Sequence, residues 1–232
     1  MQIEILQLID GAKQAQGLTV IIDVFRAFTL ETYMFASGVE RIYPVGSSDL
    51  AYLLKRENPN WILAGERAGA ILPGFDIGNA PSDLHRFDWK NKIVVHTTSA
   101  GTQGVDNAVN AEEILGCSLV NARATAEYIR KRNCERVSLV CMGLAGEEET
   151  DEDTLCARYI KAILEGKENE IDMRAEIERL KSTSGAKFFD LAQQKVFPTK
   201  DFYMSTDVDK FDFVLRLNQK EELSFMEKIT IY

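Results

Sequence analysis

The sequence contains few of the residues from which metal centres and cross-links are usually built. It has two histidines, and none of its four cysteines forms a Cys-x-x-Cys pair. A histidine-rich metal centre, a zinc site and a disulfide framework are therefore not expected, and the cysteine usage indicates a reduced, cytoplasmic protein. Long apolar runs are also missing, including from the N-terminal segment MQIEILQLIDGAK. We expect neither a signal peptide nor a membrane span.

Positive charge is scarce relative to negative charge. Lys and Arg number 27 against 36 Asp and Glu, which gives a formal net charge of −9. Nucleic acid and anionic membrane are therefore not expected as partners. A small anionic substrate is compatible with this charge, because it needs only a local positive pocket. With 232 residues, 45% of them hydrophobic, the chain is long enough for one large domain or two small ones.

The segment 18–37, LTVIIDVFRAFTLETYMFAS, organises the chain. Leu18–Ile22 has the composition of a buried strand, and a helical period starts at Ala27. Asp23 and Arg26 fall at the corner between them, where ligands bind in open α/β sheets. A carboxylate and a guanidinium at this corner suit a metal ion and an oxyanion. The alternative is that Asp23 only caps the helix and that Arg26 pairs with it.

Short apolar strands alternate with helices along the chain, which predicts an α/β fold with a mainly parallel or mixed sheet flanked by helices. Further strands are expected at 2–8, 41–45, 61–64, 92–95, 119–120, 136–141, 212–217 and 224–231, and helices at 47–57, from 101, at 122–132 and at 154–164. A turn is expected from Gly11 to Gly17.

The character of the chain changes after Gly166. Residues 1–166 are expected to form the α/β core that carries the site motifs. Residues 167–232 are expected to be a helical segment and a terminal pair of strands, packed on the same domain. Within the helical segment, the spacing of Phe189, Ala192 and Val196 predicts a stripe that faces the core.

Acidic and basic residues recur beyond the expected strand ends. Glu66 and Arg67 follow the strand at 61–64, and a Gly- and Pro-rich loop at 68–82 carries Asp76 and Asn79. Glu152 and Asp153 stand just before a helix, although an acidic run is usually solvated surface and Asp153 could simply cap that helix.

Hydroxyl groups gather after the strand at 92–95, in His96-Thr97-Thr98-Ser99-Ala100-Gly101-Thr102. Hydroxyls, a glycine and backbone N–H groups at a strand-to-helix turn make an oxyanion cradle, and the alternative is an ordinary Ser/Thr helix cap. Neither G-x-x-x-x-G-K-[ST] nor a post-strand G-x-G-x-x-G is present.

These residue types predict a Mg²⁺-assisted site for a small phosphorylated or multiply anionic substrate. Magnesium prefers about six oxygen ligands, of which one or two are usually carboxylates, and arginine pairs bind phosphate or sulfonate. Neither D-x-D pair, 151–153 or 207–209, directly ends an apolar strand. Cys117 has Arg123 six places later, but it precedes the expected strand and no glycine lies between the two. Metal-activated water is the route left by this elimination.

Six short motifs in order resemble the 2-phosphosulfolactate phosphatase family of the coenzyme M biosynthetic type. The family pattern is I-D-V-x-R-A-T-T, G-E-R, G-F-D-x-G-N-S-P, T-T-N-G-T, G-S-x-x-N-A and a late E-D before a helix. This chain has IDVFRAFT at 22–29, GER at 65–67, GFDIGNAP at 74–81, TTSAGT at 97–102, GCSLVNA at 116–122, and Glu152-Asp153.

The resemblance implies an α/β, Mg²⁺-dependent phosphatase that converts 2-phosphosulfolactate to sulfolactate. The catalytic candidates are Asp23, Arg26, Glu66 and Arg67. The metal candidates are Asp23, Glu66, Asp76 and Asp153, and the substrate-binding candidates are Asn79, Thr97, Thr98, Ser99, Gly101, Thr102 and Asn121. A small phosphoester is the expected partner, and a homodimer is left open.

The chain departs from the family pattern at Phe28, Ala80, Ser99 and Ala100, which are expected in or near the pocket, so the reaction could be retained while the substrate differs. Two alternatives stay open at this point: a non-catalytic binding protein for an organic phosphate, and a Mg²⁺-dependent lyase or transferase on a related substrate.

Overall fold

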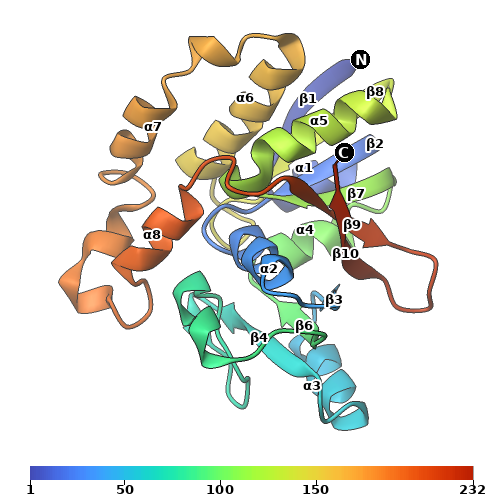
Figure 1. Cartoon of the computed structure of the whole chain (residues 1–232), viewed down its shortest axis with the longest axis vertical. Coiled ribbons are helices and arrows are strands. Elements are labelled where there is room, and N and C mark those ends of the chain that lie inside the picture. The colour runs from blue at the N-terminus through green and yellow to red at the C-terminus, as the bar shows by residue number, and fades with distance from the viewer. Residues whose placement is uncertain (232) are drawn as a thin grey trace.

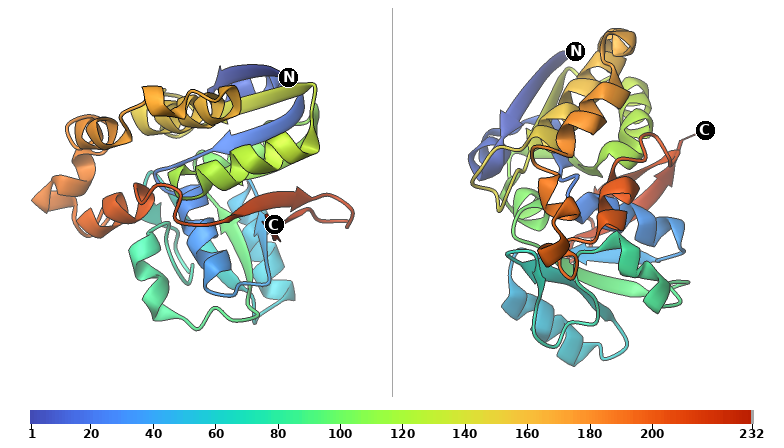
Figure 2. Two further views of the ribbon diagram at one scale, coloured as in Figure 1. Left: turned by 45° about the horizontal axis from the view of Figure 1, so that its top comes forward. Right: turned by 90° about the vertical axis from the view of Figure 1, so that its left-hand side faces the viewer.

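The computed structural model describes residues 1–231 as one ten-stranded sheet covered by helices (Figures 1 and 2). The strands are β1 (Gln2–Gln7), β2 (Gly17–Ile22), β3 (Arg41–Pro44), β4 (Ile62–Arg67), β5 (Ala70–Ile71), β6 (Ile93–Thr97), β7 (Ala111–Cys117), β8 (Arg136–Cys141), β9 (Phe213–Asn218) and β10 (Phe225–Thr230). The helices are α1 (Leu8–Gln14), α2 (Ala27–Ala36), α3 (Ser48–Glu57), α4 (Gly101–Asn107), α5 (Ala122–Arg132), α6 (Asp151–Glu165), α7 (Met173–Leu180) and α8 (Thr199–Ser205). The expected α/β class with a mixed, helix-flanked sheet is confirmed.

Two parallel blocks of strands are joined by an antiparallel hairpin. The sheet order is β1-β8-β2-β7-β9-β10-β3-β6-β4-β5. Strands β1, β8, β2 and β7 are mutually parallel, as are β3, β6 and β4. The hairpin β9–β10 pairs antiparallel with β7 on one side and with β3 on the other. The expected terminal strand pair therefore lies in the middle of the sheet, and Tyr232 lies outside the described residues.

Helices cover both faces of the sheet, and β2 shows why. Val20 and Ile22 point into a core that they share with α5 and α6, whereas Ile21 points into the core on the opposite face, which α2 and α4 also line. All six residues of β2 are buried. A strand buried on both faces reads as a continuous apolar run, which is the pattern of Leu18–Ile22.

Two local expectations were wrong for identifiable reasons. The turn expected from Gly11 to Gly17 is instead mostly helix α1; a Cβ on Gly11 would lie 2.9 Å from that of Leu6, so close packing requires the glycine. The strand expected at 119–120 lies earlier in the chain, as β7, and ends at Cys117. Leu119–Asn121 instead form a 3-10 turn. Two glutamates near the start of β7 break its apolar pattern.

The acidic pair 152–153 lies within α6 and not before it. Helix α6 starts at Asp151, and Thr150 occupies the N-cap position. Glu152 and Asp153 are therefore in the first turn, where negative charge is favoured by the helix dipole, and both side chains are buried.

The segment after α6 is less helical than expected. It contains α7, several short 3-10 turns and α8. Its predicted core stripe is wrong at Ala192, which is exposed, and the aromatic side chains of Phe188 and Phe202 are fully buried instead. Both rings pack against Phe25, just after β2, so this segment is anchored beside the Asp23 corner.

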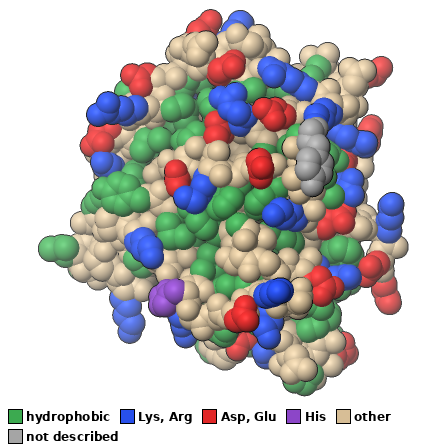
Figure 3. Space-filling model, in the orientation of Figure 1, with side chains coloured by type: hydrophobic (Ala, Val, Ile, Leu, Met, Phe, Trp, Pro, Cys, Tyr) green, Lys and Arg blue, Asp and Glu red, His purple; other side chains and the backbone are tan. Residues whose placement is uncertain are grey.

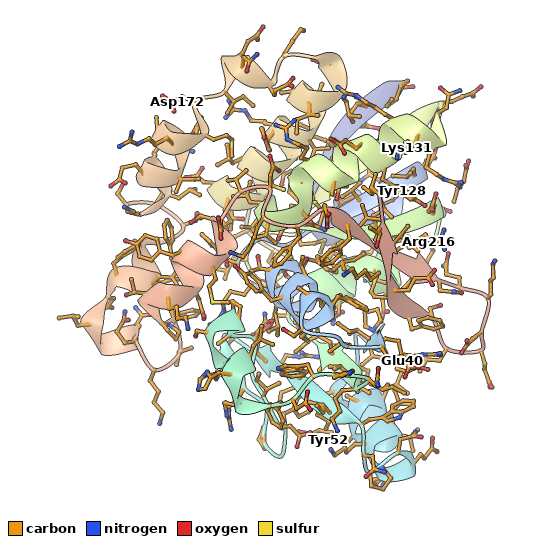
Figure 4. All side chains as sticks on the ribbon, in the orientation of Figure 1. Glu40, Tyr52, Tyr128, Lys131, Asp172 and Arg216 are labelled. Atoms are coloured by element: carbon orange, nitrogen blue, oxygen red, sulfur yellow. The ribbon has the colours of Figure 1, made fainter. Side chains whose placement is uncertain are left out.

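The outer surface carries mixed charge. Acidic and basic side chains alternate over the face shown in Figure 3. Near the hairpin, Arg216 of β9 pairs with Glu227 of β10 at 2.7 Å, and Tyr128 of α5 donates a hydrogen bond to Glu113 of β7 (Figure 4). Among residues 1–231, no helix combines the length and apolarity needed to cross a bilayer.

The central place of the hairpin predicts a large effect of a single truncation. Met226 of β10 is fully buried and pairs with Ile42 of β3, so Met226→Ala should lower the free energy of unfolding by about 2–5 kcal/mol. Thr230→Ala, at an exposed position of the same strand, should change it by less than about 0.5 kcal/mol. Urea denaturation measures both. Equal small effects would show that the hairpin contributes little to the core.

Candidate active site

A pocket opens where loops from the two parallel blocks meet. Its charged lining residues are Asp23, Arg26, Glu66, Glu152 and Lys187. They come from the ends of β2 and β4, the first turn of α6, and the segment between α7 and α8. Five charged side chains around one concave site, three acidic and two basic, suit a ligand that carries negative charge next to a cation.

Asp23 lies at the corner where β2 ends, as the sequence predicts. Its Oδ1 accepts a hydrogen bond from the N–H of Ala27, the first residue of α2, at 3.0 Å, so it does cap this helix. Only 4% of Asp23 is exposed. Burial raises the pKa of Asp23 to about 6, and the nearby Glu66 and Glu152 carboxylates contribute to this increase. Hydrogen bonds from the N–H groups of Ala27 and Gly101 lower the pKa and so oppose part of the increase. Asp23 therefore caps α2 and also belongs to an acidic pocket.

Glu66 ties two pocket loops together. Its Oε1 accepts from the Ser99 N–H at 2.7 Å, and its Oε2 accepts from the Gly69 N–H at 2.6 Å and from Ser99 Oγ at 3.2 Å. A carboxylate that accepts several N–H and O–H groups holds their loops in one arrangement. Glu66 thus orders the segment after β4 against the segment after β6.

Arg26 pairs with Asp201 and not with Asp23. Its Nη1 donates to Asp201 Oδ2 and to the Val196 carbonyl, both at 2.8 Å. Both members of this ion pair are almost fully buried, and the guanidinium also lies 4.9 Å from the ring centroid of Phe197. The alternative that Asp23 and Arg26 pair is therefore wrong. The Nη2 of Arg26 lies 3.5 Å from the Gly69 carbonyl, and within residues 1–231 its Nε–H has no hydrogen-bond partner.

Glu152 and Asp153 complete the acidic cluster. Burial raises the pKa of both, and for Asp153 the Glu152 and Asp23 carboxylates add to the effect. Asp153 accepts from the N–H groups of Val24 and Gly143, each at 2.8 Å, and so joins the loops after β2 and β8. It is not among the pocket-lining residues. Asp153 therefore connects these two loops, and it is not the cap of α6.

Lys187 and Asp201 were not singled out by the sequence, because both lie in the charged segment beyond Gly166. Lys187 lines the pocket, and no carboxylate in residues 1–231 comes within 4.0 Å of its Nζ. Burial lowers its pKa; Glu152 opposes this shift and Arg26 adds to it. Only their position in the fold identifies these two residues, since nothing in their local sequence marks them.

Arg67 and Asp76 do not line the pocket. Arg67 donates to the carbonyls of Glu66 and Gly46 and to Thr97 Oγ1, at 2.7, 3.0 and 2.9 Å. Asp76 accepts from the Leu63 N–H at 2.8 Å and pairs with Lys55 of α3 at 3.0 Å. Both charges hold β4 and the loop that follows it, so Asp76 is not proposed as a metal ligand and Arg67 is not proposed as a catalytic residue.

Most of the predicted hydroxyl cradle faces inward. Thr98 and Thr102 hydrogen-bond one another across the start of α4, where Thr102 Oγ1 accepts from the Thr98 N–H at 2.8 Å. Ser99 lines the pocket, while Gly101 lies so close to Asp23 that a Cβ there would be 2.9 Å from Oδ2. The helix-cap alternative describes Thr98 and Thr102, and Ser99 lines the pocket.

Asn121 and Cys117 also lie outside the pocket. Asn121 accepts from the Ser118 N–H at 3.0 Å in the turn after β7. Cys117 does end a strand, contrary to the expectation, but its thiol is fully buried and Arg123 pairs with Asp209 at 3.1 Å. A cysteinyl-phosphate loop is therefore not formed here.

Two of the four departures from the family pattern line the pocket. Ser99 and Ala100 do so, whereas Phe28 and Ala80 do not. Phe28 is fully buried against Gly116, where a Cβ on the glycine would lie 2.4 Å from the ring. The substitution at Phe28 therefore changes the core, and the differences at Ser99 and Ala100 alter the ligand surface.

The donor set of the pocket fits a hard cation. Asp23 and Glu152 supply carboxylate oxygens, and Glu152 Oε2 is buried with no hydrogen-bond partner among the described residues. No group of three or more His, Cys, Asp or Glu in residues 1–231 is placed to enclose a metal. Mg²⁺ is often held by one or two carboxylates plus substrate oxygens and water, and Asp23 and Glu152 are the two carboxylates that could serve here.

Comparison with known proteins gives one consistent result. The family model described as 2-phosphosulpholactate phosphatase matches residues 3–220. A probable 2-phosphosulfolactate phosphatase of Bacillus subtilis (strain 168) is 33% identical over 215 residues, which is 92% of each chain. Proteins with the same name from Carboxydothermus hydrogenoformans and Caldanaerobacter subterraneus subsp. tengcongensis are 36% and 32% identical, over 71% and 90% of this chain and 68% and 80% of theirs.

The raised pKa of Asp23 predicts a stabilising, pH-dependent substitution. In the unfolded chain Asp23 ionises near pH 3.8 and in the folded protein near 6, so its ionisation destabilises the fold increasingly as pH rises through this range. Without metal, Asp23→Asn should raise the free energy of unfolding by up to ~3 kcal/mol at pH 8, and far less at pH 4, while still accepting from Ala27.

Denaturation in EDTA at both pH values measures this effect. Asp10→Asn is the matched control, because Asp10 is exposed and forms a surface ion pair with Lys13. Destabilisation by Asp23→Asn at pH 8 would show that the ionised carboxylate stabilises the fold.

Proposed function

Because the chain belongs to the 2-phosphosulfolactate phosphatase family, we propose that it hydrolyses a small phosphoester that carries a second anionic group, with the help of Mg²⁺. The observation that supports this most directly is the pocket, in which Asp23, Glu66 and Glu152 lie beside Arg26 and Lys187. Acidic oxygens suit the cation, and the two basic side chains suit the anionic groups of the substrate. We take 2-phosphosulfolactate as the first substrate to test.

Two basic groups suit a substrate with two anionic groups. Arg26 is held in place by Asp201 and keeps its Nε–H for a ligand oxygen. Lys187 has no carboxylate partner within 4.0 Å in residues 1–231, and its surroundings include the rings of Phe188 and Phe197. A partly desolvated ammonium without an ion pair attracts an anion strongly. We therefore assign phosphate and sulfonate binding to these two side chains.

The acidic residues are proposed to hold the metal. Asp23 and Glu152 would bind Mg²⁺, because Glu152 Oε2 lacks a partner in the described chain and the Asp23 carboxylate is electrostatically coupled to Glu152. Mg²⁺ would supply charge neutralisation at the phosphoryl oxygens and would acidify a coordinated water. Glu66 keeps the 66–69 and 99–101 segments in register around the substrate.

Hydrolysis then requires water to attack phosphorus while the bond from phosphorus to the ester oxygen breaks, leaving inorganic phosphate and an alcohol. In this proposal Arg26 and Lys187 bind and orient the substrate anions, and Phe25 and Phe197 form apolar walls of the pocket that limit access of water. We further propose that the reaction takes place in the cytoplasm and serves a biosynthesis of the coenzyme M type. A homodimer is the assembly to test.

Metal dependence and phosphate release test the proposal together. Phosphate release from 2-phosphosulfolactate and a panel of other phosphoesters should require Mg²⁺ or Mn²⁺, stop in EDTA and return when the metal is added back. A phosphoester that disappears without phosphate release would indicate a lyase or transferase, and binding without turnover would indicate a binding protein. Full turnover in metal-free buffer would contradict the metal role.

Replacing the unpaired lysine should weaken substrate binding selectively. Lys187→Met should raise KM for 2-phosphosulfolactate about 10-fold or more, because a charge-assisted contact is lost, with a smaller effect on a phosphoester that has no second anionic group. Lys195→Met is the control, since Lys195 is exposed and does not line the pocket. Steady-state kinetics measure both variants, and an unchanged KM for Lys187→Met would remove Lys187 from substrate recognition.

A further inference from the structure

Behind the pocket, a buried chain of three polar side chains connects α2 to the pocket wall through β6. Glu31 Oε1 lies 2.7 Å from His96 Nδ1, and His96 Nε2 lies 3.2 Å from Asn79 Oδ1. Glu31 and His96 are fully buried, and Asn79 is 6% exposed and lines the pocket. Burying polar groups of this kind costs free energy unless each one has a hydrogen-bond partner.

The arrangement determines where one proton resides. His96 is the only hydrogen-bond partner of the Glu31 carboxyl among the described residues, and Glu31 Oε2 has none. Asn79 Oδ1 can only accept, so its contact with His96 Nε2 requires a proton on Nε2. A second proton lies between Nδ1 and Glu31 Oε1 and is carried by the ring or by the carboxyl. In both cases Nε2–H donates to Asn79 Oδ1.

That donation sets the direction of the Asn79 amide. With its oxygen held by His96, the NH₂ group of Asn79 is left without a hydrogen-bond partner in residues 1–231, at a residue that lines the pocket. An amide turned the other way would present its oxygen, which repels an anionic substrate. The protonation of His96 Nε2 thus decides whether Asn79 offers a donor or an acceptor.

We propose that Glu31 and His96 are positioning residues that keep the NH₂ group of Asn79 directed at an anionic oxygen of the substrate. This inference rests on the proposed function for the identity of the ligand, an organic phosphate with a second anionic group. Glu31 and His96 themselves do not touch the substrate, and they act through Asn79.

The first test needs no turnover. The chain has two histidines, His96 and the exposed His85, so long-range ¹H–¹⁵N NMR resolves both, and His85→Ala assigns them. At pH 7 we expect Nε2 of His96 to carry a proton, because it faces Asn79 Oδ1 at 3.2 Å. A His96 ring with a bare Nε2 at pH 7 would overturn the inference, because Asn79 would then have to donate to it.

The second test is a double-mutant cycle read in KM, in kcat and in the Kd of inorganic phosphate. Asn79→Ala and His96→Leu should each raise KM and Kd about 10-fold, with kcat changed less than about 3-fold, and the double variant should be no worse than either single variant. His96→Gln, which can place an amide N–H near the former Nε2, should recover most of the loss.

The outcomes separate this inference from the proposed function. Additive losses, or a phosphate Kd that His96→Leu leaves unchanged, would show that His96 is only structural. Should His96→Leu fail to fold, His96→Gln and the NMR measurement still decide. Absence of phosphatase activity together with a coupled effect on phosphate binding would overturn the proposed function and leave the positioning role in place.

Discussion

The ion pair between Arg26 and Asp201 holds the site together. Its two residues are 175 positions apart in sequence, yet their side chains meet at 2.8 Å with almost no exposure. Asp201 also accepts from the Ser82 N–H, so one carboxylate links the β2 corner, the long loop at 68–82 and α8. Removing one partner of such a pair is costly, because the other charge is left buried and unpaired. This ion pair and the packing of Phe188 and Phe202 against Phe25 together join the Lys187 segment to the β2 corner.

The pocket concentrates negative charge that the fold only partly neutralises. Three acids line it, and burial raises the pKa of Asp23 and Glu152 while it lowers that of Lys187. Each shift shows that the ionised form is less stable in the folded protein than in water. A cation near the acidic side chains and an anion near the basic ones would offset the free-energy cost of ionising these buried groups. The charges that destabilise the free protein therefore favour binding of a metal and a substrate.

The sheet accounts for how distant motifs share one pocket. Parallel strands place the residues that follow them at one edge, which brings Asp23 near the end of β8 and Glu66 near the end of β6. The two blocks run in opposite directions across the β9–β10 hairpin, and the loops from both nevertheless line the pocket, so the sheet has to twist and bend between them. The C-terminal hairpin is thus part of what brings the two halves of the site together.

Local pattern in the sequence determined the class of fold and three of the five charged residues that line the pocket. The apolar run 18–22, the corner residues Asp23 and Arg26, and Glu66 after a strand are local signals, because strand period and strand-end position need no knowledge of the rest of the chain. The tertiary structure alone decided which charges face a ligand. Asp76 and Arg67 carry equally strong local signals, but Lys55 and backbone carbonyls use their charges. Lys187, Asp201 and the Glu31–His96–Asn79 chain carry no local signal, since each depends on contacts between residues far apart in sequence, and such contacts exist only once the strands and loops have been brought together.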